Sequence, residues 1–368
     1  MSEVPVNLGD FEPLAKACLP RMAYDYFAGG ANDEHLLQSA RDAWNAIELR
    51  FRVLRDVSTR SHDCRVLASD LAWPLMIAPM ALQRMAHPEG ECATARAAAA
   101  SGCGMILSTL STTAIEEVRT AMDDVRQRGA PLWFQLYIAK DRAATQALVQ
   151  RAESAGATAL VLTVDTPVLG RRERDIRNAF RIPDGLATPH LLPQSTTALR
   201  THNDSASALA TYVDRQWDDA ISWRDVEWLR SLTSLPVLLK GVVRGDDAAR
   251  ALACGAAGVI VSNHGGRQLD ASVTTARALR EVAAAMEGHG VLLVDGGIRR
   301  GTDIVRALAL GAHAVLLGRP VLWALAVGGE AGVVEMLGLL RAELDLAMAL
   351  CGCSTLADVT PDLLAPRT

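Results

Sequence analysis

The segment with the clearest capacity for chemistry is SNHGGRQLD, residues 262–270. It follows a short apolar run and places two glycines and an arginine directly after a histidine. A histidine can act as a general base near neutral pH, and a guanidinium group can hold a carboxylate through two parallel hydrogen bonds. The segment therefore predicts a base, His264, beside an anion clamp, Arg267. The alternative is a purely structural turn.

Two later segments have the character of a phosphate site. Asp295, Gly296, Gly297 and Arg299 follow one apolar run, and Gly318 with Arg319 follows the next. Backbone N–H groups and arginines at such places bind phosphate, so a phosphorylated cofactor or substrate is expected. No GxGxxG motif follows an early strand, which disfavours a Rossmann dinucleotide site. No HxH, HExxH or Cys/His cluster occurs, so no metal site is predicted.

The elements that must position these groups form a repeating pattern. From about residue 73, short apolar runs alternate with longer Ala-rich amphipathic segments, which is typical of βα units. Glycines such as Gly156, Gly255 and Gly311 end several expected helices just before the next run. The expected strands are residues 74–79, 104–108, 132–136, 159–164, 237–240, 258–262, 291–295 and 314–318. Eight strands predict an α/β fold, a TIM (β/α)8 barrel, with an open doubly wound sheet as the runner-up.

Active sites of TIM barrels lie at the carboxyl ends of the strands. Each expected strand ends in a polar, Gly or Pro feature: Pro79 with Met80 and Ala81, Ser108, Gln135 with Tyr137, Thr163 with Asp165, Lys240, Ser262 with His264, Asp295, and Gly318 with Arg319. Any one of these residues could be an ordinary turn or cap. Together they predict a ring around one bound ligand. Asp165 could orient the imidazole of His264 and stabilise its charged form.

The chain is expected to form a single domain. Residues 1–72 form an N-terminal cap with helices over 11–18 and 24–44, residues 73–325 form the barrel, and residues 326–368 form a C-terminal helical segment. The polar span 183–222 interrupts the pattern after the fourth strand. Loops of this length in a compact domain are functional lids or disordered segments, so a mobile lid over the active site is expected.

Composition excludes several classes of protein. A net charge of -5 argues against a nucleic-acid partner, and 50% hydrophobic residues exclude a disordered chain. The first residues lack the pattern of a secretory signal, and no uninterrupted apolar run reaches the length of a membrane span. A cytoplasmic protein without a membrane partner is therefore expected. The seven cysteines are scattered and are interpreted as reduced core residues.

The residues resemble those of the FMN-dependent 2-hydroxy acid oxidases and dehydrogenases, the family of glycolate oxidase, lactate oxidase, mandelate dehydrogenase and 4-hydroxymandelate oxidase. The resemblance covers nearly the whole chain. Its carriers are YDYFAGGANDE (24–34), MAHPEGE (85–91), FQLY (134–137), LTVDTPVLGRRERDIRN (162–178), LLKGV (238–242), SNHGGRQLD (262–270), LVDGGIRRGTD (293–303) and LGRP (317–320).

The resemblance implies that FMN binds without a covalent bond across the barrel mouth. Its expected contacts are Pro79, Met80, Ala81, Ser108, Gln135, Thr163, Lys240 and Ser262, with the phosphate at the strand-end segment of Asp295 and Gly296 and held by Gly297, Arg299, Gly318 and Arg319. Tyr26, Arg172 and Arg267 are expected to hold the substrate carboxylate, with Tyr137 near the 2-hydroxyl. A cation such as Lys240 near the flavin stabilises the anionic reduced ring.

The implied reaction oxidises a 2-hydroxy acid to the 2-oxo acid. His264 removes a proton as two electrons reach the flavin, through either a hydride or a carbanion route, and oxygen then regenerates FMN and yields hydrogen peroxide. Members of the family form tetramers or octamers, so a homo-oligomer is expected.

Departures from the family bear on the substrate. Leu110 stands where glycolate oxidase has a tryptophan, which predicts a wider pocket, and Met80 and Leu82 make the wall more apolar. A medium-chain or aryl substrate such as a mandelate is therefore expected rather than glycolate. Ala81, where the membrane-linked mandelate dehydrogenase has glycine, favours an oxidase. The alternatives are a dehydrogenase that passes electrons to a quinone or protein acceptor, a non-redox barrel such as an isomerase, and an inactive binding protein.

Overall fold

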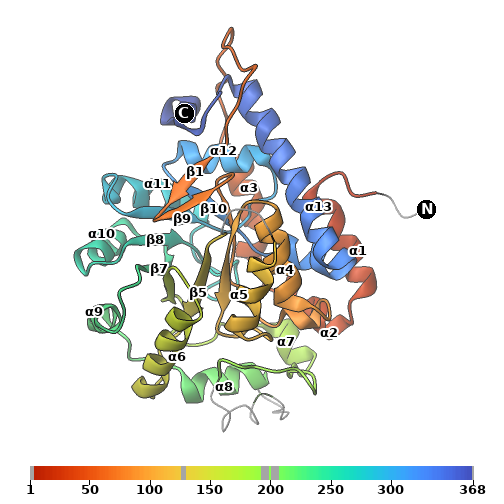
Figure 1. Cartoon of the computed structure of the whole chain (residues 1–368), viewed down its shortest axis with the longest axis vertical. Coiled ribbons are helices and arrows are strands. Elements are labelled where there is room, and N and C mark those ends of the chain that lie inside the picture. The colour runs from red at the N-terminus through yellow and green to blue at the C-terminus, as the bar shows by residue number, and fades with distance from the viewer. Residues whose placement is uncertain (1–3, 126–129, 192–198, 200–206, 367–368) are drawn as a thin grey trace.

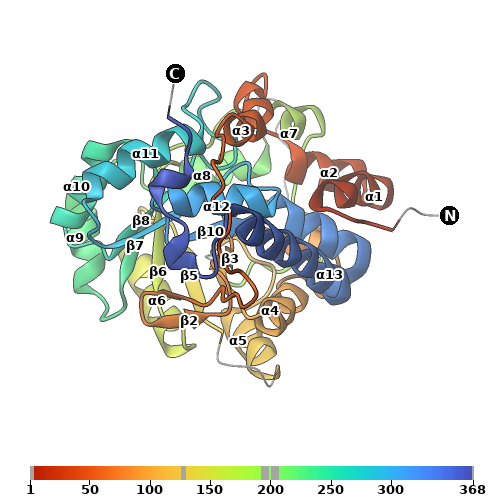
Figure 2. The same cartoon turned by 90° about the horizontal axis from the view of Figure 1, so that it is seen from above.

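A computed structural model describes residues 4–125, 130–191, 199 and 207–366 of the chain. Eight parallel strands close into a barrel at its centre, and helices surround them (Figures 1 and 2). The strands are β3 (Leu75–Ile77), β4 (Gly104–Ser108), β5 (Leu132–Leu136), β6 (Leu160–Thr163), β7 (Val237–Val242), β8 (Gly258–Val261), β9 (Val291–Val294) and β10 (Ala314–Leu317). Because β10 pairs with β3, the sheet has no open edge. The TIM barrel prediction is confirmed, and the doubly wound sheet is wrong.

Each barrel strand is apolar on both faces because both faces are buried. Inward side chains such as Ile106, Trp133 and Leu238 fill the barrel, whereas their neighbours pack outward against the helices. A short antiparallel hairpin of β1 (Cys64–Val66) and β2 (Ser69–Leu71) contributes Val66 and Leu71 to the inner cluster. The N–H of Ala72, directly after the hairpin, donates to the carbonyl of Gly102 just before β4, so the hairpin lies at the amino ends of the strands and leaves the carboxyl ends for ligands.

The helices around the barrel follow the strands in turn. They are α4 (Gly90–Ala100), α5 (Ile115–Asp123), α6 (Arg142–Ser154), α9 (Trp223–Ser231), α10 (Gly245–Ala253), α11 (Thr275–Met286), α12 (Gly301–Ala309) and α13 (Arg319–Cys351). The last is long and apolar enough to cross a membrane by length and composition. However, Gly328 and Gly329 depart from helical geometry, and its buried residues, such as Trp323 and Leu337, belong to the core. It is therefore a kinked core helix.

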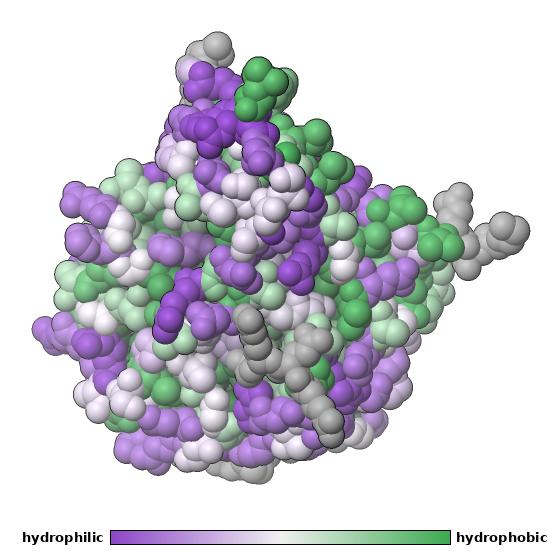
Figure 3. Space-filling model, turned by 45° about the horizontal axis from the view of Figure 1, so that its top comes forward, coloured by the Kyte–Doolittle hydropathy of each residue, from purple (hydrophilic) through white to green (hydrophobic). Residues whose placement is uncertain are grey.

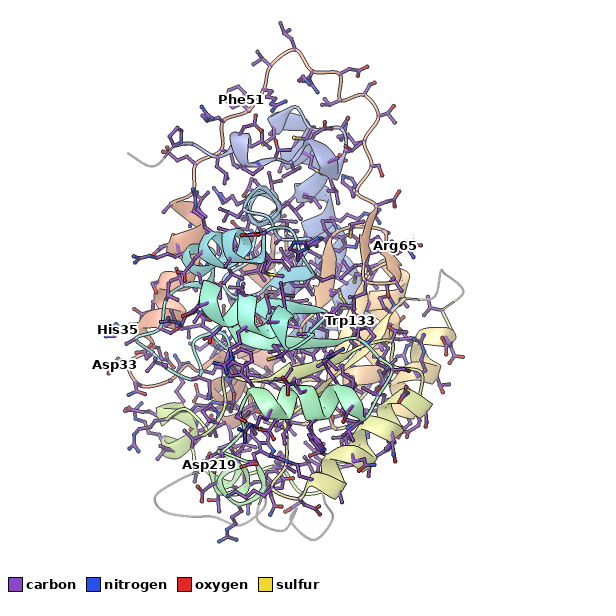
Figure 4. All side chains as sticks on the ribbon, turned by 90° about the vertical axis from the view of Figure 1, so that its left-hand side faces the viewer. Asp33, His35, Phe51, Arg65, Trp133 and Asp219 are labelled. Atoms are coloured by element: carbon purple, nitrogen blue, oxygen red, sulfur yellow. The ribbon has the colours of Figure 1, made fainter. Side chains whose placement is uncertain are left out.

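The N-terminal region differs from expectation in one element. Helix α1 (Phe11–Cys18) lies where expected, but the single helix expected over 24–44 is wrong: the region forms α2 (Arg21–Ala28) and α3 (His35–Asn45). The chain breaks at Gly29 and Gly30 and turns over the barrel mouth, where the N–H of Ala31 donates to the carbonyl of Gly266. Figure 4 shows Asp33 and His35 at this turn, on the surface. The break lets a helix end approach the ligand site.

The described part of the excursion after β6 contains two helices. Helix α7 (Glu173–Arg177) precedes the expected lid, and α8 (Ala208–Gln216) lies near its end. The lid prediction fell on residues 183–222, of which 192–198 and 200–206 lie outside the described residues. In the part that is described, Ser207 caps the start of α8: its hydroxyl accepts a hydrogen bond from the N–H of Ala210. This helix lies at the bottom of Figure 1.

Candidate active site

A cavity of about 160 Å³ opens at the carboxyl ends of the barrel strands. Most residues predicted for the site line it: Tyr26, Pro79, Met80, Ala81, Ser108, Leu110, Gln135, Tyr137, Thr163, Arg172, Lys240, His264, Arg267, Asp295, Gly296, Gly297, Arg299, Gly318 and Arg319. The other two, Asp165 and Ser262, lie directly behind His264 and Lys240, to which they are hydrogen-bonded. Sequence reasoning therefore located one contiguous site.

His264 and Asp165 form a buried pair. Nδ1 of His264 lies 2.8 Å from Oδ1 of Asp165, and the hydroxyl of Thr166 donates to the same oxygen at 2.9 Å. If Nδ1 carries the proton shared with the carboxylate, Nε2 is the atom that can accept a proton from a ligand. His264 has a left-handed backbone with φ of 56°, which non-glycine residues seldom adopt. The loop therefore fixes the direction of the imidazole.

The electrostatics of this pair suit a base. Burial lowers the pKa of His264, because desolvation disfavours the imidazolium, and the Asp165 carboxylate offsets part of this effect. Burial alone would raise the pKa of Asp165, but His264 and Lys240 outweigh it and the pKa is lowered. At neutral pH the imidazole is thus free to accept a proton beside a carboxylate that can stabilise the resulting charge.

Four arginines converge on the cavity: Arg172, Arg267, Arg299 and Arg319. Within the described part of the chain, no salt bridge joins any of them to a carboxylate. Burial lowers the pKa of Arg172 and of Arg299 to about 10 and that of Arg319 to about 9. Burying a guanidinium without a counter-ion costs free energy, so anionic ligands would stabilise this cluster.

The hydrogen bonds of two of these arginines refine the prediction. Arg267 donates to the carbonyls of Tyr26 and Gly29, and Arg319 donates to those of Phe27 and Gly29. These carbonyls end α2, where the helix dipole favours cations. The guanidinium carbon of Arg267 also lies 5.1 Å from the centre of the Tyr26 ring. Both arginines are thus held in place before any ligand binds.

The wall expected to contact the flavin forms a polar belt across neighbouring strands. The side-chain oxygen of Gln135 accepts from the Ser108 hydroxyl at 3.2 Å, and its nitrogen donates to Thr163 at 3.0 Å. Lys240 donates to Ser262 at 2.8 Å and forms an ion pair with Asp295 at 3.1 Å. The second oxygen of Asp295 is buried without a partner. The ion pair of Lys240 with Asp295 was not foreseen from the sequence.

These residues fit FMN. Amide and hydroxyl groups that present both donors and acceptors suit the edge of a flavin ring. Arg299 and Arg319, with Gly297 and Gly318 beside them, suit a phosphate, and Arg172 with Arg267 remains for a second anion. Among the described residues, no group of His, Cys, Asp or Glu side chains is arranged to hold a metal ion.

Several lining residues were missed from the sequence. The apolar ones are Phe27, Ala78, Leu169, Leu209, Trp217, Ile298, Leu316, Leu317 and Leu322. Trp217 stacks on Tyr137 with ring centres 3.6 Å apart, and Tyr26 stacks on Phe180 at 4.4 Å. An isolated tryptophan in the polar span before residue 222 was the only available signal for the first of these contacts.

His190 does not line the active-site cavity. It is buried, it lies 3.0 Å from the hydroxyl of Ser111, and its Nε2 accepts from the N–H of Ile115. Burial lowers its pKa to about 4, so it is neutral. Its contacts are those of a structural residue.

A barrel that joins a polar belt, buried arginines without counter-ions and a His–Asp pair fits one class: FMN-dependent oxidoreductases of the TIM-barrel type. The chain belongs to the FMN-dependent dehydrogenase family, whose sequence profile matches residues 15–366. The family resemblance and the FMN cofactor are thereby confirmed. The assignment as a 2-hydroxy acid oxidase is confirmed by relatives that are themselves oxidases.

Individual relatives agree with this assignment. The chain is 54% identical over 362 residues to an L-lactate oxidase from Nostoc sp. (strain PCC 7120), covering 98% of both chains. It is 49% identical over 363 residues to glycolate oxidase 1 from Zea mays, covering 98% of this chain and 95% of that protein. A crystal structure of mandelate oxidase with (S)-4-hydroxymandelic acid superposes with a TM-score of 0.92 at 42% identity, covering 96% of this chain and 97% of that one.

Proposed function

We propose that the protein oxidises an (S)-2-hydroxy acid to the 2-oxo acid with His264 as the base and molecular oxygen as the electron acceptor, giving hydrogen peroxide. The main support for this proposal is that the His264–Asp165 pair lies at the same cavity as Arg172 and Arg267. FMN, when bound, takes up the two electrons of the substrate and passes them to oxygen. The balance is one 2-hydroxy acid and one O2 consumed for each 2-oxo acid and H2O2 formed.

The anion clamp orients the substrate. Arg172 is buried with its Nε unpartnered, so a carboxylate would satisfy it, and Arg267 lies on the same cavity wall. Burial raises the pKa of Tyr137, which keeps its hydroxyl protonated and able to donate to a ligand oxygen. A carboxylate held here presents the 2-hydroxyl toward His264, which takes up the proton at Nε2. Asp165 then stabilises the imidazolium.

The substrate is proposed to be a medium-chain or aryl 2-hydroxy acid. Met80, Leu110, Leu169 and Leu209 give the cavity an apolar wall, and leucine at position 110 leaves more space than a tryptophan would. The relatives named above include lactate, glycolate and mandelate oxidases, so the family spans small and aryl substrates. The apolar wall favours the larger ones.

The test is anaerobic bleaching of the flavin spectrum by a panel of 2-hydroxy acids, followed by readmission of air. Bleaching by medium-chain or aryl acids, with one H2O2 formed per substrate, is expected. Rapid reduction of a quinone or dye, with slow oxygen consumption, would instead identify a dehydrogenase. An enzyme whose flavin is bleached by none of these acids would not have the proposed function.

A further inference from the structure

A second cavity, of about 220 Å³, adjoins the active-site cavity. Among the residues that the structure describes, two line both cavities: Tyr137, which follows β5, and Trp217, which ends α8. Their rings stack with an angle of 16° between the planes. The stacked pair is therefore the partition between the two cavities.

The partition is held firmly on the side of Trp217. The chain around Ala139 forms an antiparallel bridge with Trp217, the N–H of Asp218 donates to Ile138 at 3.0 Å, and the N–H of Lys140 donates to Gln216 at 2.9 Å. Arg142 adds a salt bridge to Asp218 at 2.6 Å. These bonds fasten the end of α8 to the segment that carries Tyr137, so the indole stays against the phenol ring.

The second cavity suits an uncharged, apolar group. Its wall joins apolar residues such as Ala144, Leu148 and Leu191 to uncharged polar ones such as Thr109, Thr145 and Gln216. The arginine among its described residues, Arg151, is paired with Glu116 at 2.8 Å and donates to the carbonyl of Pro189. Neutral His190 is engaged by Ser111 and Ile115, as described above. Among the described residues of this wall, none therefore presents an uncompensated charge.

We propose that Trp217 sets the upper limit on the length of the substrate side chain by closing the way from the active-site cavity into the second cavity. The carboxylate of a 2-hydroxy acid is anchored on the arginine side, so its side chain points toward the apolar wall that ends at the Tyr137–Trp217 pair. With the indole removed, a longer chain can extend into the second cavity. This inference rests on the proposed function, because it assumes a 2-hydroxy acid in the active site.

The experiment compares wild type with Trp217→Ala, Trp217→Phe and Leu148→Ala. The kcat/KM for flavin reduction is measured with straight-chain 2-hydroxy acids from four to twelve carbons. Wild type is expected to show a maximum and then a fall, and Trp217→Ala should move the maximum to longer acids. Each methylene that becomes buried should gain about fourfold. Trp217→Phe should give an intermediate profile, which keeps the test valid if the alanine variant folds poorly. Leu148→Ala enlarges only the second cavity and should keep the wild-type profile.

A second readout does not depend on turnover. Binding of unreactive straight-chain carboxylic acids, measured by calorimetry, should extend to longer chains in Trp217→Ala in the same way. An unchanged chain-length profile in both Trp217 variants, a uniform loss at every length, or the same shift in Leu148→Ala would overturn the inference. Failure of wild type to reduce its flavin with any acid would overturn the proposed function instead.

Discussion

His264 is the base in the proposed proton transfer, and its contacts indicate no role in holding FMN. Its Nδ1 contacts Asp165, and its backbone N–H donates to the Ser262 hydroxyl. The residues expected to hold the phosphate are elsewhere in the cavity. His264→Asn should therefore keep FMN, and asparagine tolerates the left-handed backbone at this position. Flavin reduction in anaerobic stopped-flow should slow by about two to four orders of magnitude. A variant that retains FMN and is reduced at the wild-type rate would exclude His264 as the base.

Asp165 controls the pH at which the base works. The pKa of His264 is lowered from its ordinary value of 6.5, so the wild-type rate should hold at neutral pH and fall only as the pH drops below that value. The Asp165 carboxylate raises this pKa, so Asp165→Asn should move the acid limb of kcat/KM to lower pH and also slow the reaction. The measurement is kcat/KM of both proteins at pH values between about 4 and 9, a range that spans the reference pKa of histidine. An acid limb that stays in place would show that Asp165 does not act on the base.

At the scale of elements, strand β7 shapes the site through an irregularity. Its register with β8 shifts between Lys240 and Val242, and Gly241 there has φ of 111°. A Cβ at Gly241 would lie 2.5 Å from the side chain of Asp165. Such irregularities commonly re-aim side chains next to active sites. The glycine gives Asp165 room to reach His264.

Gly241→Ala should therefore displace Asp165, slow flavin reduction, and lower stability by about 1–3 kcal/mol. Gly288→Ala is the matched control, because its φ is 77° but nothing lies within 4 Å of the added Cβ. The control should lose some stability in urea and keep its rate of flavin reduction. Equal rates in the two variants would contradict the role assigned to Gly241.

The loop after β4 supplies the other wall that limits the substrate. The N–H of Leu110 donates to Ser108, and its carbonyl accepts from Leu82, so its side chain has a fixed place in the cavity. Leu110→Trp should fill this space and favour short acids such as glycolate over aryl acids. Leu110→Met conserves volume and should leave the ratio of kcat/KM values nearly unchanged. A tryptophan variant that prefers bulky acids would remove Leu110 from the substrate wall.

At the scale of the whole molecule, the buried arginines link cofactor binding to stability. Burial lowers the pKa values of Arg299 and Arg319, and the phosphate of FMN is expected beside these two arginines. Removing FMN should lower the Tm, and adding it back at a thousandfold excess over its Kd should restore about 4 kcal/mol. Riboflavin, which lacks the phosphate, should restore less. Equal stabilisation by both would place the phosphate away from these arginines.

The far end of the molecule carries a projecting arm, on which Phe51 is labelled in Figure 4. Phe51, Val53 and Leu54 are exposed there, as are Leu346 and Leu350 near the end of α13. Apolar surface is visible at this projecting end in Figure 3. The homo-oligomer expected from the family resemblance stays a prediction, and light scattering of the purified protein would measure it. The cytoplasmic location also stays a prediction.

The sequence by itself determined the barrel and most of the ring around its mouth. Both are local signals: a strand buried on both faces is a short apolar run, and its carboxyl end is marked by the next polar or glycine residue. Ser108 and Thr163 could be found in this way because each is the last residue of its strand, whereas Lys240 lies two residues before the end of β7. The break between α2 and α3 was missed even though Gly29 and Gly30 mark it, because the amphipathic pattern continues on both sides.

Only the tertiary structure decided which of these residues act on one another. Lys240 and Asp295 come from strands that are not neighbours in the sheet, and Trp217 meets Tyr137 across 80 residues of chain by virtue of α8 folding back on the segment after β5. Such contacts leave no period or spacing in the sequence, since they depend on where distant segments come together in space. The base and the anion clamp lie in one short segment, so the sequence predicted them. The partition between the two cavities joins distant segments, so it appeared only in the folded chain.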